Sequence, residues 1–268
     1  MTPSRDWTEV RWADTGPADA SRWIAVLPLA ATEQHGPHLP LETDVLIAEA
    51  YLARVREVLP APIPATFLPV EPIGISTEHI NYPGTQTLPT EVALKRWTAI
   101  GEDIARRGLK KLVIITSHGG NSAAMMLVAQ DLRAHRKMFV VTTSWSRLSG
   151  AERLFPADEV RHGIHGGAVE TSIMLARYPN QVREDAIADF PASSVAMEKQ
   201  YRWLSTQRPA PFAWQAQDLN TSGAVGNATL AVADKGDQLL DQGARAFCEL
   251  LAEVDNFDVN RLAKGPLG

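Results

Sequence analysis

Three short segments of the 268-residue chain gather side chains that could bind a metal ion. They span residues 30–44, 117–121 and 161–172, and they hold five of the seven histidines together with several carboxylates. Carboxylate and imidazole groups without thiolates suit Zn²⁺, Mn²⁺ or Fe²⁺. The residue types in these segments therefore predict a site for divalent metal ions.

The first two segments offer ligands that can converge on one point. Glu33 and His35 are two residues apart, so their side chains point the same way in an extended chain. Asp44 closes the same loop, and His118 directly follows an apolar run. Four or more ligands from separate strand ends suggest two ions that share a bridging carboxylate. Ions about 3.5–4 Å apart activate water and polarise the group to be cleaved.

Other readings of these residues stay open. A single loop histidine is more often a surface or hydrogen-bonding residue than a ligand, and we interpret His79, His135 and His162 in this way. His38 lies in the dense first segment but behind a Gly-Pro pair, so its role is undecided. Glu42 is either a solvated charge or a carboxylate favoured by a helix start.

The elements that must position these residues alternate along the chain. Continuous apolar runs at 23–29, 65–70, 111–117 and 137–143 predict strands that are buried on both faces. Helical spacing follows at 44–58, 90–107, 121–135, 166–176 and 234–254, and Thr90 is a candidate N-cap. Residues 207–226 are rich in Pro, Ala, Gln, Asn and Gly and predict a long loop. This alternation predicts an α/β fold with a mostly parallel central sheet, in a single domain over residues 1–268.

Composition excludes several classes of protein. The net charge of −5 argues against a surface built for nucleic acid, and the single cysteine, Cys248, excludes a disulfide framework and a cysteine-based zinc module. The Gly119-Gly120 turn lacks the Lys-Ser/Thr pair of a phosphate-binding P-loop. The apolar runs are too short to span a membrane, and the polar N-terminal segment has no secretory signal. We expect a cytoplasmic protein that binds neither nucleic acid nor membrane.

Four motifs together resemble the creatininase family of metal-dependent amidohydrolases. They are EQHGPHLPLETD at 33–44, GISTEHINYPGT at 74–85, SHGGN at 117–121 and HGGAVETS at 165–172. Their order is that of the family, and the resemblance covers about the first two-thirds of the chain. It implies a three-layer α/β/α sandwich, a binuclear metal centre, cleavage of C–N amide bonds and a homo-oligomer, usually a hexamer.

The resemblance also implies roles for single residues. By position, the metal ligands are Glu33, His35, Asp44 and His118, with Asp44 bridging both ions. His165 matches the acid/base histidine of the family, and Ser76 lies where creatininases contact substrate.

One segment departs from the pattern of creatininases proper. Creatininases proper have a segment similar to His-Tyr-Glu-Asn after the third strand, and its glutamate is a metal ligand. This chain has His118-Gly119-Gly120-Asn121 there, so Gly120 stands in place of the glutamate. HGGN resembles other branches, including formamidopyrimidine deformylases and a peptide-maturation peptidase. We therefore expect Glu170, on the first turns of the helix after His165, to supply the missing ligand. Creatinine itself becomes a doubtful substrate.

The expected function is hydrolysis of a C–N bond in a small amide, cyclic or open, by two divalent ions (Zn²⁺ or Mn²⁺, with Fe²⁺ as a further option). Deformylation of a formamide and maturation of a peptide are alternatives within the family. A non-catalytic metal-binding partner in a biosynthetic assembly is an alternative from another class. Such a partner would not need His165, because an imidazole beside the ligands serves proton transfer.

Overall fold

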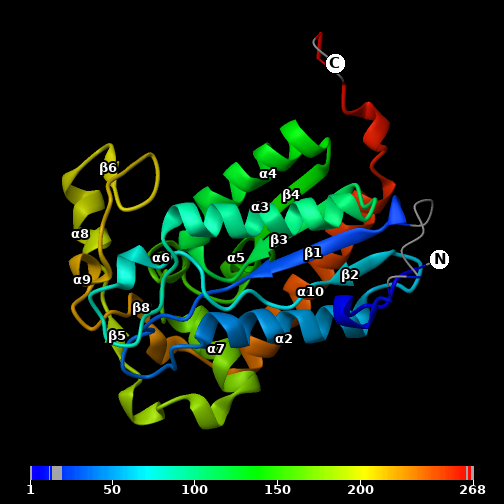
Figure 1. Cartoon of the computed structure of the whole chain (residues 1–268). Coiled ribbons are helices and arrows are strands. Elements are labelled where there is room, and N and C mark those ends of the chain that lie inside the picture. Colours follow the sequence, from blue (N-terminus) through cyan, green and yellow to red (C-terminus); the bar gives the residue numbers. More distant parts are fainter. Residues whose placement is uncertain (1, 12, 14–19, 264, 267–268) are drawn as a thin grey trace.

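The computed structural model describes residues 2–11, 13, 20–263 and 265–266, so part of the polar N-terminal segment lies outside the described residues. At its centre is a four-stranded parallel sheet in the order β2-β1-β3-β4 (Figure 1). Its strands are β1 (Ile24–Leu29), β2 (Ala65–Phe67), β3 (Lys111–Thr116) and β4 (Phe139–Ser144). All four strands predicted from apolar runs are present.

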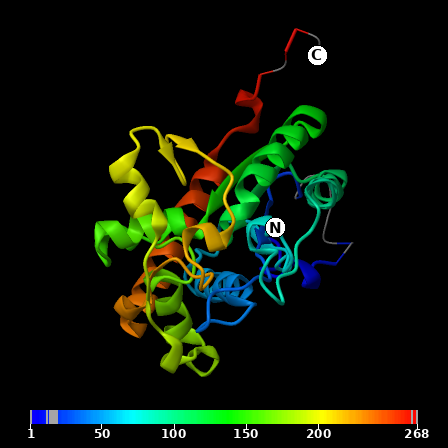
Figure 2. The same cartoon turned by 90° about the vertical axis from the view of Figure 1, so that its left-hand side faces the viewer.

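Helices cover both faces of the sheet. One face packs on α2 (Thr43–Val58), α7 (Ala168–Arg177) and α10 (Ala233–Asn256), and the other on α3 (Thr90–Arg106) and α4 (Ser122–Arg136). Alternate residues of β1 divide between the two cores: Val26 faces the first and Leu27 the second. The predicted three-layer α/β/α fold is confirmed (Figures 1 and 2).

The order of the strands creates a switch point beside β1. The chain leaves β1 through α2 to β2 on one side, then crosses through α3 to β3 on the other side. Ligands in such sheets bind beyond the carboxyl ends of the two strands where the winding reverses. Here those strands are β1 and β3, and the segments that follow them carry Glu33, His35 and His118.

Predicted helix boundaries agree closely with the structure, with one correction. The N-cap of α3 is Pro89, and Thr90 is the first helical residue. Pro89 holds an extended conformation (φ −55°, ψ 140°) that starts the helix without a side-chain cap. The prediction of Thr90 as N-cap is therefore wrong by one position.

The region between α7 and α10 is built from short elements beside the carboxyl ends of the sheet (left in Figure 1). The predicted loop at 207–226 includes β7 (Ala210–Pro211) and α9 (Ala216–Leu219) and reaches β8 (Gly226–Asn227), because local turns and strand pairs organise it. None of the described helices is long and apolar enough to cross a membrane. The remaining short helices and strands are α5 (Trp145–Leu148), α6 (Ala157–His162), α8 (Ser193–Gln200), α9 (Ala216–Leu219), β5 (Asp189–Phe190), β6 (Leu204–Ser205), β7 (Ala210–Pro211) and β8 (Gly226–Asn227).

Candidate metal centre

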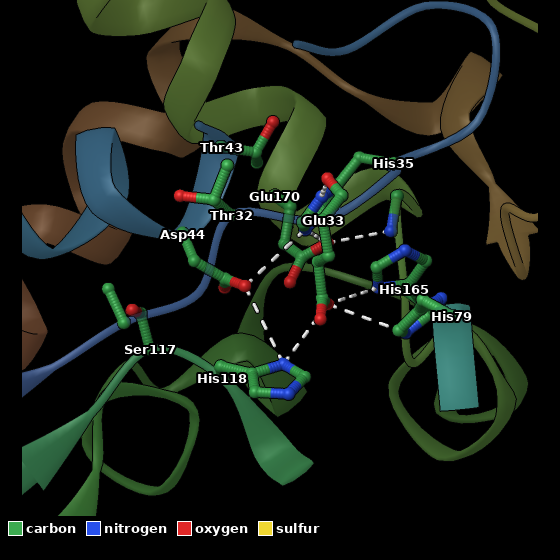
Figure 3. A network of polar contacts seen from close by, with 12 residues as sticks. Thr32, Glu33, His35, Thr43, Asp44, His79, Ser117, His118, His165 and Glu170 are labelled. Carbon is green, nitrogen blue, oxygen red and sulfur yellow. Dashed lines mark hydrogen bonds and ion pairs between the residues drawn. The ribbon is translucent and has the colours of Figure 1, made fainter. Parts of the chain in front are cut away.

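Glu33, in the loop after β1, lies at the middle of a buried polar cluster (Figure 3). Its Oε1 is 3.0 Å from His118 Nδ1, 3.4 Å from His79 Nε2 and 3.6 Å from His165 Nδ1. The residue is fully buried, yet neither carboxylate oxygen accepts a hydrogen bond within the described part of the chain. A buried carboxylate without a donor is costly unless a cation or proton compensates it.

His35 and Asp44 extend this cluster. The His35 Nδ1–H donates to the backbone oxygen of Glu33 at 3.0 Å, so the lone pair lies on Nε2. That nitrogen is 3.8 Å from Asp44 Oδ2, which is itself 3.6 Å from His118 Nδ1. Asp44 belongs to the first turn of α2 and thus faces two imidazoles from two different loops.

His118 is oriented by its other ring nitrogen. Its Nε2–H donates to the Ile75 carbonyl at 2.8 Å, which turns Nδ1 toward Glu33 and Asp44. Asn121, at the end of the same motif, donates to Ala30 O at 3.0 Å and accepts from Ile75 N at 2.9 Å. The HGGN segment therefore ties together the loop after β1, the loop after β3 and the segment around residue 75.

Glu170 reaches the cluster from the first turn of α7. Its Oε2 lies 3.9 Å from His35 Nε2 and accepts the backbone N–H of Gly166 at 2.6 Å. At 21% side-chain exposure, it is nearer to solvent than Glu33 or Asp44. This places it on the His35 side of the centre, whereas His118 lies on the other side of Asp44 (Figure 3).

The spacing of these atoms suits metal binding. Two ligand atoms, each about 2.1 Å from one ion, stand about 3–3.5 Å apart. Four neighbouring pairs have separations of this order: 3.0 Å for Glu33–His118, 3.6 Å for His118–Asp44, 3.8 Å for His35–Asp44 and 3.9 Å for His35–Glu170. Among the described residues, Glu33 Oε1, His35 Nε2 and Asp44 Oδ2 also have no hydrogen-bond partner, as expected of atoms that face a cation. The residues present thus fit a metal.

Burial and mutual charge shift the pKa values of this group in opposite directions. Burial and the neighbouring charge of Glu33 raise the pKa of Asp44 well above its usual range. Burial opposes ionisation of Glu33, but the histidines, led by His118, outweigh it and lower its pKa. Burial, aided by the charge of His165, lowers the pKa of His35 and takes that of His79 to about 3. These two imidazoles are therefore neutral.

His79 also belongs to this cluster. It lies in the 3-10 turn Thr77–His79, is 2% exposed and hydrogen-bonds through Nδ1 with Gln34 Nε2 at 2.8 Å, so of the two expected alternatives it is a hydrogen-bonding residue and not a surface one. It stands in the GISTEHINYPGT motif, directly after Glu78. That motif follows β2 and returns to the switch point, because Ile75 N and O bond to Asn121 and His118.

The remaining histidines lie outside the cluster. His38 is buried, bonds to Thr171 Oγ1 at 2.9 Å and stacks on Phe190. His162 is also buried, and its Nδ1 hydrogen-bonds with Ser194 Oγ at 2.9 Å. Of the two expected alternatives, a surface residue or a hydrogen-bonding one, the second holds. His135 is exposed on α4.

Two further predicted features can be placed. Ser76 is fully buried, and its Oγ has no hydrogen-bond partner among the described residues. Glu42 occupies the N-cap position of α2 without a side-chain cap bond.

Gly120 leaves no room for a side chain. A Cβ atom there would come within 2.5 Å of Ile75 O and Glu78 Oε1, and nearer still to His118 Nε2. Glu78 lies behind the imidazole of His118, with its Oε1 3.5 Å from Nε2. A glutamate side chain at position 120 would therefore displace the Ile75 carbonyl that orients His118. The present geometry has no room at this position for the carboxylate that the resemblance to creatininases proper would lead us to expect.

Comparisons with known proteins agree with this geometry. A family profile described as Creatininase, creatinine amidohydrolase, matches residues 8–251. Creatinine amidohydrolase of Pseudomonas putida is 28% identical over 246 residues, which cover 86% of this chain and 89% of that protein. Mycofactocin precursor peptide peptidase of Mycobacterium ulcerans (strain Agy99) is 29% identical over 258 residues, which cover 92% and 89% respectively.

Solved structures show the same likeness. A creatinine amidohydrolase aligns with a TM-score of 0.76 at 25% identity and covers 95% of this chain and 99% of its own. Two further creatininases, a manganese form and a zinc-zinc form of a variant, align at 25% identity with TM-scores of 0.75 and 0.73. They cover 93% and 94% of this chain and 98% of their own chains.

Proposed function

The chain belongs to the creatininase family of metal-dependent amidohydrolases, and on this premise we propose that it hydrolyses a small amide with two divalent ions. The observation that carries the proposal is the position of Asp44. Its Oδ2 lies 3.6 Å from His118 Nδ1 and 3.8 Å from His35 Nε2, between two sets of ligands. A carboxylate in that position can be shared by two ions.

The two proposed sites divide the cluster. Glu33, Asp44 and His118 would hold one ion, and His35, Asp44 and Glu170 the other. Zn²⁺ and Mn²⁺ suit these ligands, and the solved zinc and manganese forms of creatininase support that choice. Fe²⁺ is a further option on ligand chemistry alone.

The ions, when bound, supply Lewis acidity that acidifies water and polarises the amide carbonyl. The protein contributes the rest. The buried walls around Glu33 and His35 exclude bulk solvent, which strengthens every charge interaction at the reacting group. His165 presents its Nδ1 to the centre and would pass a proton to the departing nitrogen. Ser76, with an unpaired buried hydroxyl, would donate to or accept from the substrate.

The proposal also names a substrate class. Hydrolysis of a small amide is our leading choice, and deformylation of a formamide and maturation of a peptide are alternatives. The likeness to a mycofactocin precursor peptide peptidase supports the last of these. A non-catalytic metal-binding partner is less well supported, because the described relatives are hydrolases and His165 lies beside the ligands.

The form of the whole protein is also part of the proposal. We propose a single domain that assembles into a homo-oligomer, a hexamer by likeness to the family, and acts in the cytoplasm. The alignment over nearly all of a solved creatininase supports the single domain.

The test is a panel of amides assayed with metal-reconstituted protein. Creatinine, hydantoins, formamides and short peptides are incubated with protein that carries two equivalents of Zn²⁺ or Mn²⁺, and Asp44→Asn is the matched control. We expect turnover of at least one class by the wild type, and loss of both ions or loose retention of one in Asp44→Asn. Two tightly bound ions in Asp44→Asn would contradict the bridging role. Inactivity of fully loaded wild type toward every member would contradict the enzyme proposal.

A further inference from the structure

Gln34 lies between Glu33 and His35 in the chain, and its side chain contacts four polar groups. Its side chain is buried, at 6% exposure of the residue. The Nε2 group contacts Gly223 O at 3.0 Å, His79 Nδ1 at 2.8 Å and, more distantly, His165 Nε2 at 3.2 Å. The Oε1 atom accepts the N–H of Gly36 at 2.9 Å.

Two backbone groups fix which way this amide faces. A backbone N–H can only donate and a backbone carbonyl can only accept, so Oε1 must face Gly36 N and Nε2 must face Gly223 O. Gly223 has φ +86°, and a Cβ there would collide with the amide of Gln34. The chain therefore holds the amide in one orientation.

This orientation assigns the tautomer of His79. Gln34 Nε2 carries two hydrogens, and one of them is donated to His79 Nδ1 at 2.8 Å. Nδ1 is then the acceptor nitrogen, and the ring proton of the neutral imidazole lies on Nε2. That Nε2–H faces Glu33 Oε1 at 3.4 Å, so His79 presents a donor to the centre. Its lone pair is already engaged by Gln34, which argues against His79 as a metal ligand.

The same residue places the His165 proton on Nε2 as well, but the other end of this ring faces the centre. Its Nε2 lies 2.5 Å from the backbone oxygen of Gln34, a contact that only an N–H can make favourably. The lone pair is then on Nδ1, which faces Glu33 Oε1 at 3.6 Å. His165 and His79 stack with ring centroids 4.2 Å apart, so one face of the centre carries an acceptor beside a donor.

We propose that Gln34 is a positioning residue that holds His79 as a hydrogen-bond donor and His165 as a proton acceptor toward the metal centre. Its side-chain amide sets the first tautomer and its backbone carbonyl sets the second. The catalytic consequence rests on the proposed amidohydrolase function. There, His165 takes and returns the proton, while His79 donates a hydrogen bond to an oxygen of the reacting group.

The test changes the amide into a pure acceptor. Gln34→Glu keeps the size of the side chain but cannot donate, so His79 should move its proton to Nδ1. Histidine tautomers are read by two-bond ¹H–¹⁵N correlation spectra of ¹⁵N-histidine protein, with and without two equivalents of Zn²⁺. Signals are assigned by their absence in His79→Gln and His165→Gln. We expect the His79 tautomer to invert in Gln34→Glu and the His165 tautomer to stay, because its partner is backbone.

Metal content and kinetics supply two further measurements. Gln34→Glu and His79→Gln should both retain two ions, and kcat of Gln34→Glu should fall about 10²-fold, within the range of acid–base groups. Gln34→Met, which neither donates nor accepts, should leave His79 as a mixture of tautomers. It also covers the case in which the carboxylate of Gln34→Glu prevents folding. Gln238→Glu, the same change on the exposed side of α10, should alter none of these quantities.

The outcomes separate this inference from the proposed function. An unchanged His79 tautomer in both Gln34 variants, or a proton on Nδ1 of neutral His79 or His165 in the wild type, would overturn the inference whatever the activity. Loss of an ion in His79→Gln would make His79 a ligand and overturn it as well. An inverted His79 tautomer in Gln34→Glu with no hydrolysis by the wild type would leave the positioning role of Gln34 intact and refute the amidohydrolase proposal instead.

Discussion

Two buried carboxylates of this protein are surrounded in opposite ways. Glu33 is fully buried and accepts no hydrogen bond within the described chain, and its neighbours are imidazoles and another carboxylate. Glu159, on α6, is 6% exposed and accepts from Ala168 N and from Asn227 N, each at 2.7 Å. Each oxygen of Glu159 thus has its own backbone donor, and neither oxygen of Glu33 has one among the described residues.

The glycines around Glu159 show what its environment is built for. A Cβ on Gly167 or Gly226 would come within 2.6 or 2.8 Å of its Oε1. The carboxylate thus fills a nest of backbone that joins α6, the start of α7 and β8. The backbone of the fold binds Glu159, whereas the oxygens of Glu33 accept no hydrogen bond from the described residues. Burial is common to the two acids, so it is their bonding that supports the proposal of Glu33, and not Glu159, as a ligand.

The largest expected effect separates the two residues at the metal. Glu33→Gln should lose an ion and reduce turnover by about 10³-fold or more, because a buried charged ligand is removed. The metal-free variant should still unfold cooperatively in urea, since no hydrogen bond between elements of the fold is lost. Metal analysis after gel filtration and urea unfolding in chelator measure the two quantities. Retention of both ions would place Glu33 with Glu159 as a structural acid.

Glu170 is the intermediate case. Its Oε2 accepts a backbone N–H, as Glu159 does, but it also faces His35. We expect Glu170→Gln to weaken one metal equivalent, spare the other and reduce turnover by about 10²-fold. Titration of metal-free protein with Zn²⁺ would show one tight and one weakened site. Two tight sites and near-normal turnover would reduce Glu170 to a residue that stabilises the start of α7.

Glu159→Gln should have the converse effect. The amide nitrogen of the new glutamine would face a backbone N–H where a carboxylate oxygen now accepts from it. One charge-assisted hydrogen bond is therefore lost, which lowers the free energy of unfolding by about 2 kcal/mol. Both ions should remain bound at temperatures where the variant is folded. Urea unfolding in chelator and metal analysis check this, and a stable variant that lacks an ion would break the distinction between the two acids.

The smallest effect concerns two neighbouring glycines. Gly120→Ala should displace His118 and weaken metal binding by about 10-fold, because its Cβ would press on the imidazole and on Ile75 O. Gly119→Ala is the matched control, since a Cβ there meets nothing within 4 Å. Zn²⁺ titrations of the two variants should differ by that factor. Equal affinities would mean that Gly120 does not help to orient His118.

Sequence reasoning placed some members of the cluster together and left others apart, for identifiable reasons. Glu33, His35 and Asp44 share one loop, so local spacing was enough to bring them together as candidates. His79 is 44 residues beyond His35 in a segment with one histidine, so local spacing could not join it to them. The carboxylate of Glu159 offers no signal at all in sequence, because its partners are backbone amides 9 and 68 residues away.

The sequence by itself determined the order of strands and helices, their approximate boundaries and the segments that carry the candidate ligands. These features depend on hydrophobic periodicity and turn residues, which act over a few positions. The tertiary structure alone decided that β1 lies between β2 and β3, which brings the loops after β1 and β3 to one switch point. It also decided which buried acid is bonded and which is left open. Both depend on contacts between residues far apart in the chain, and these form only when the sheet and its two helical layers pack.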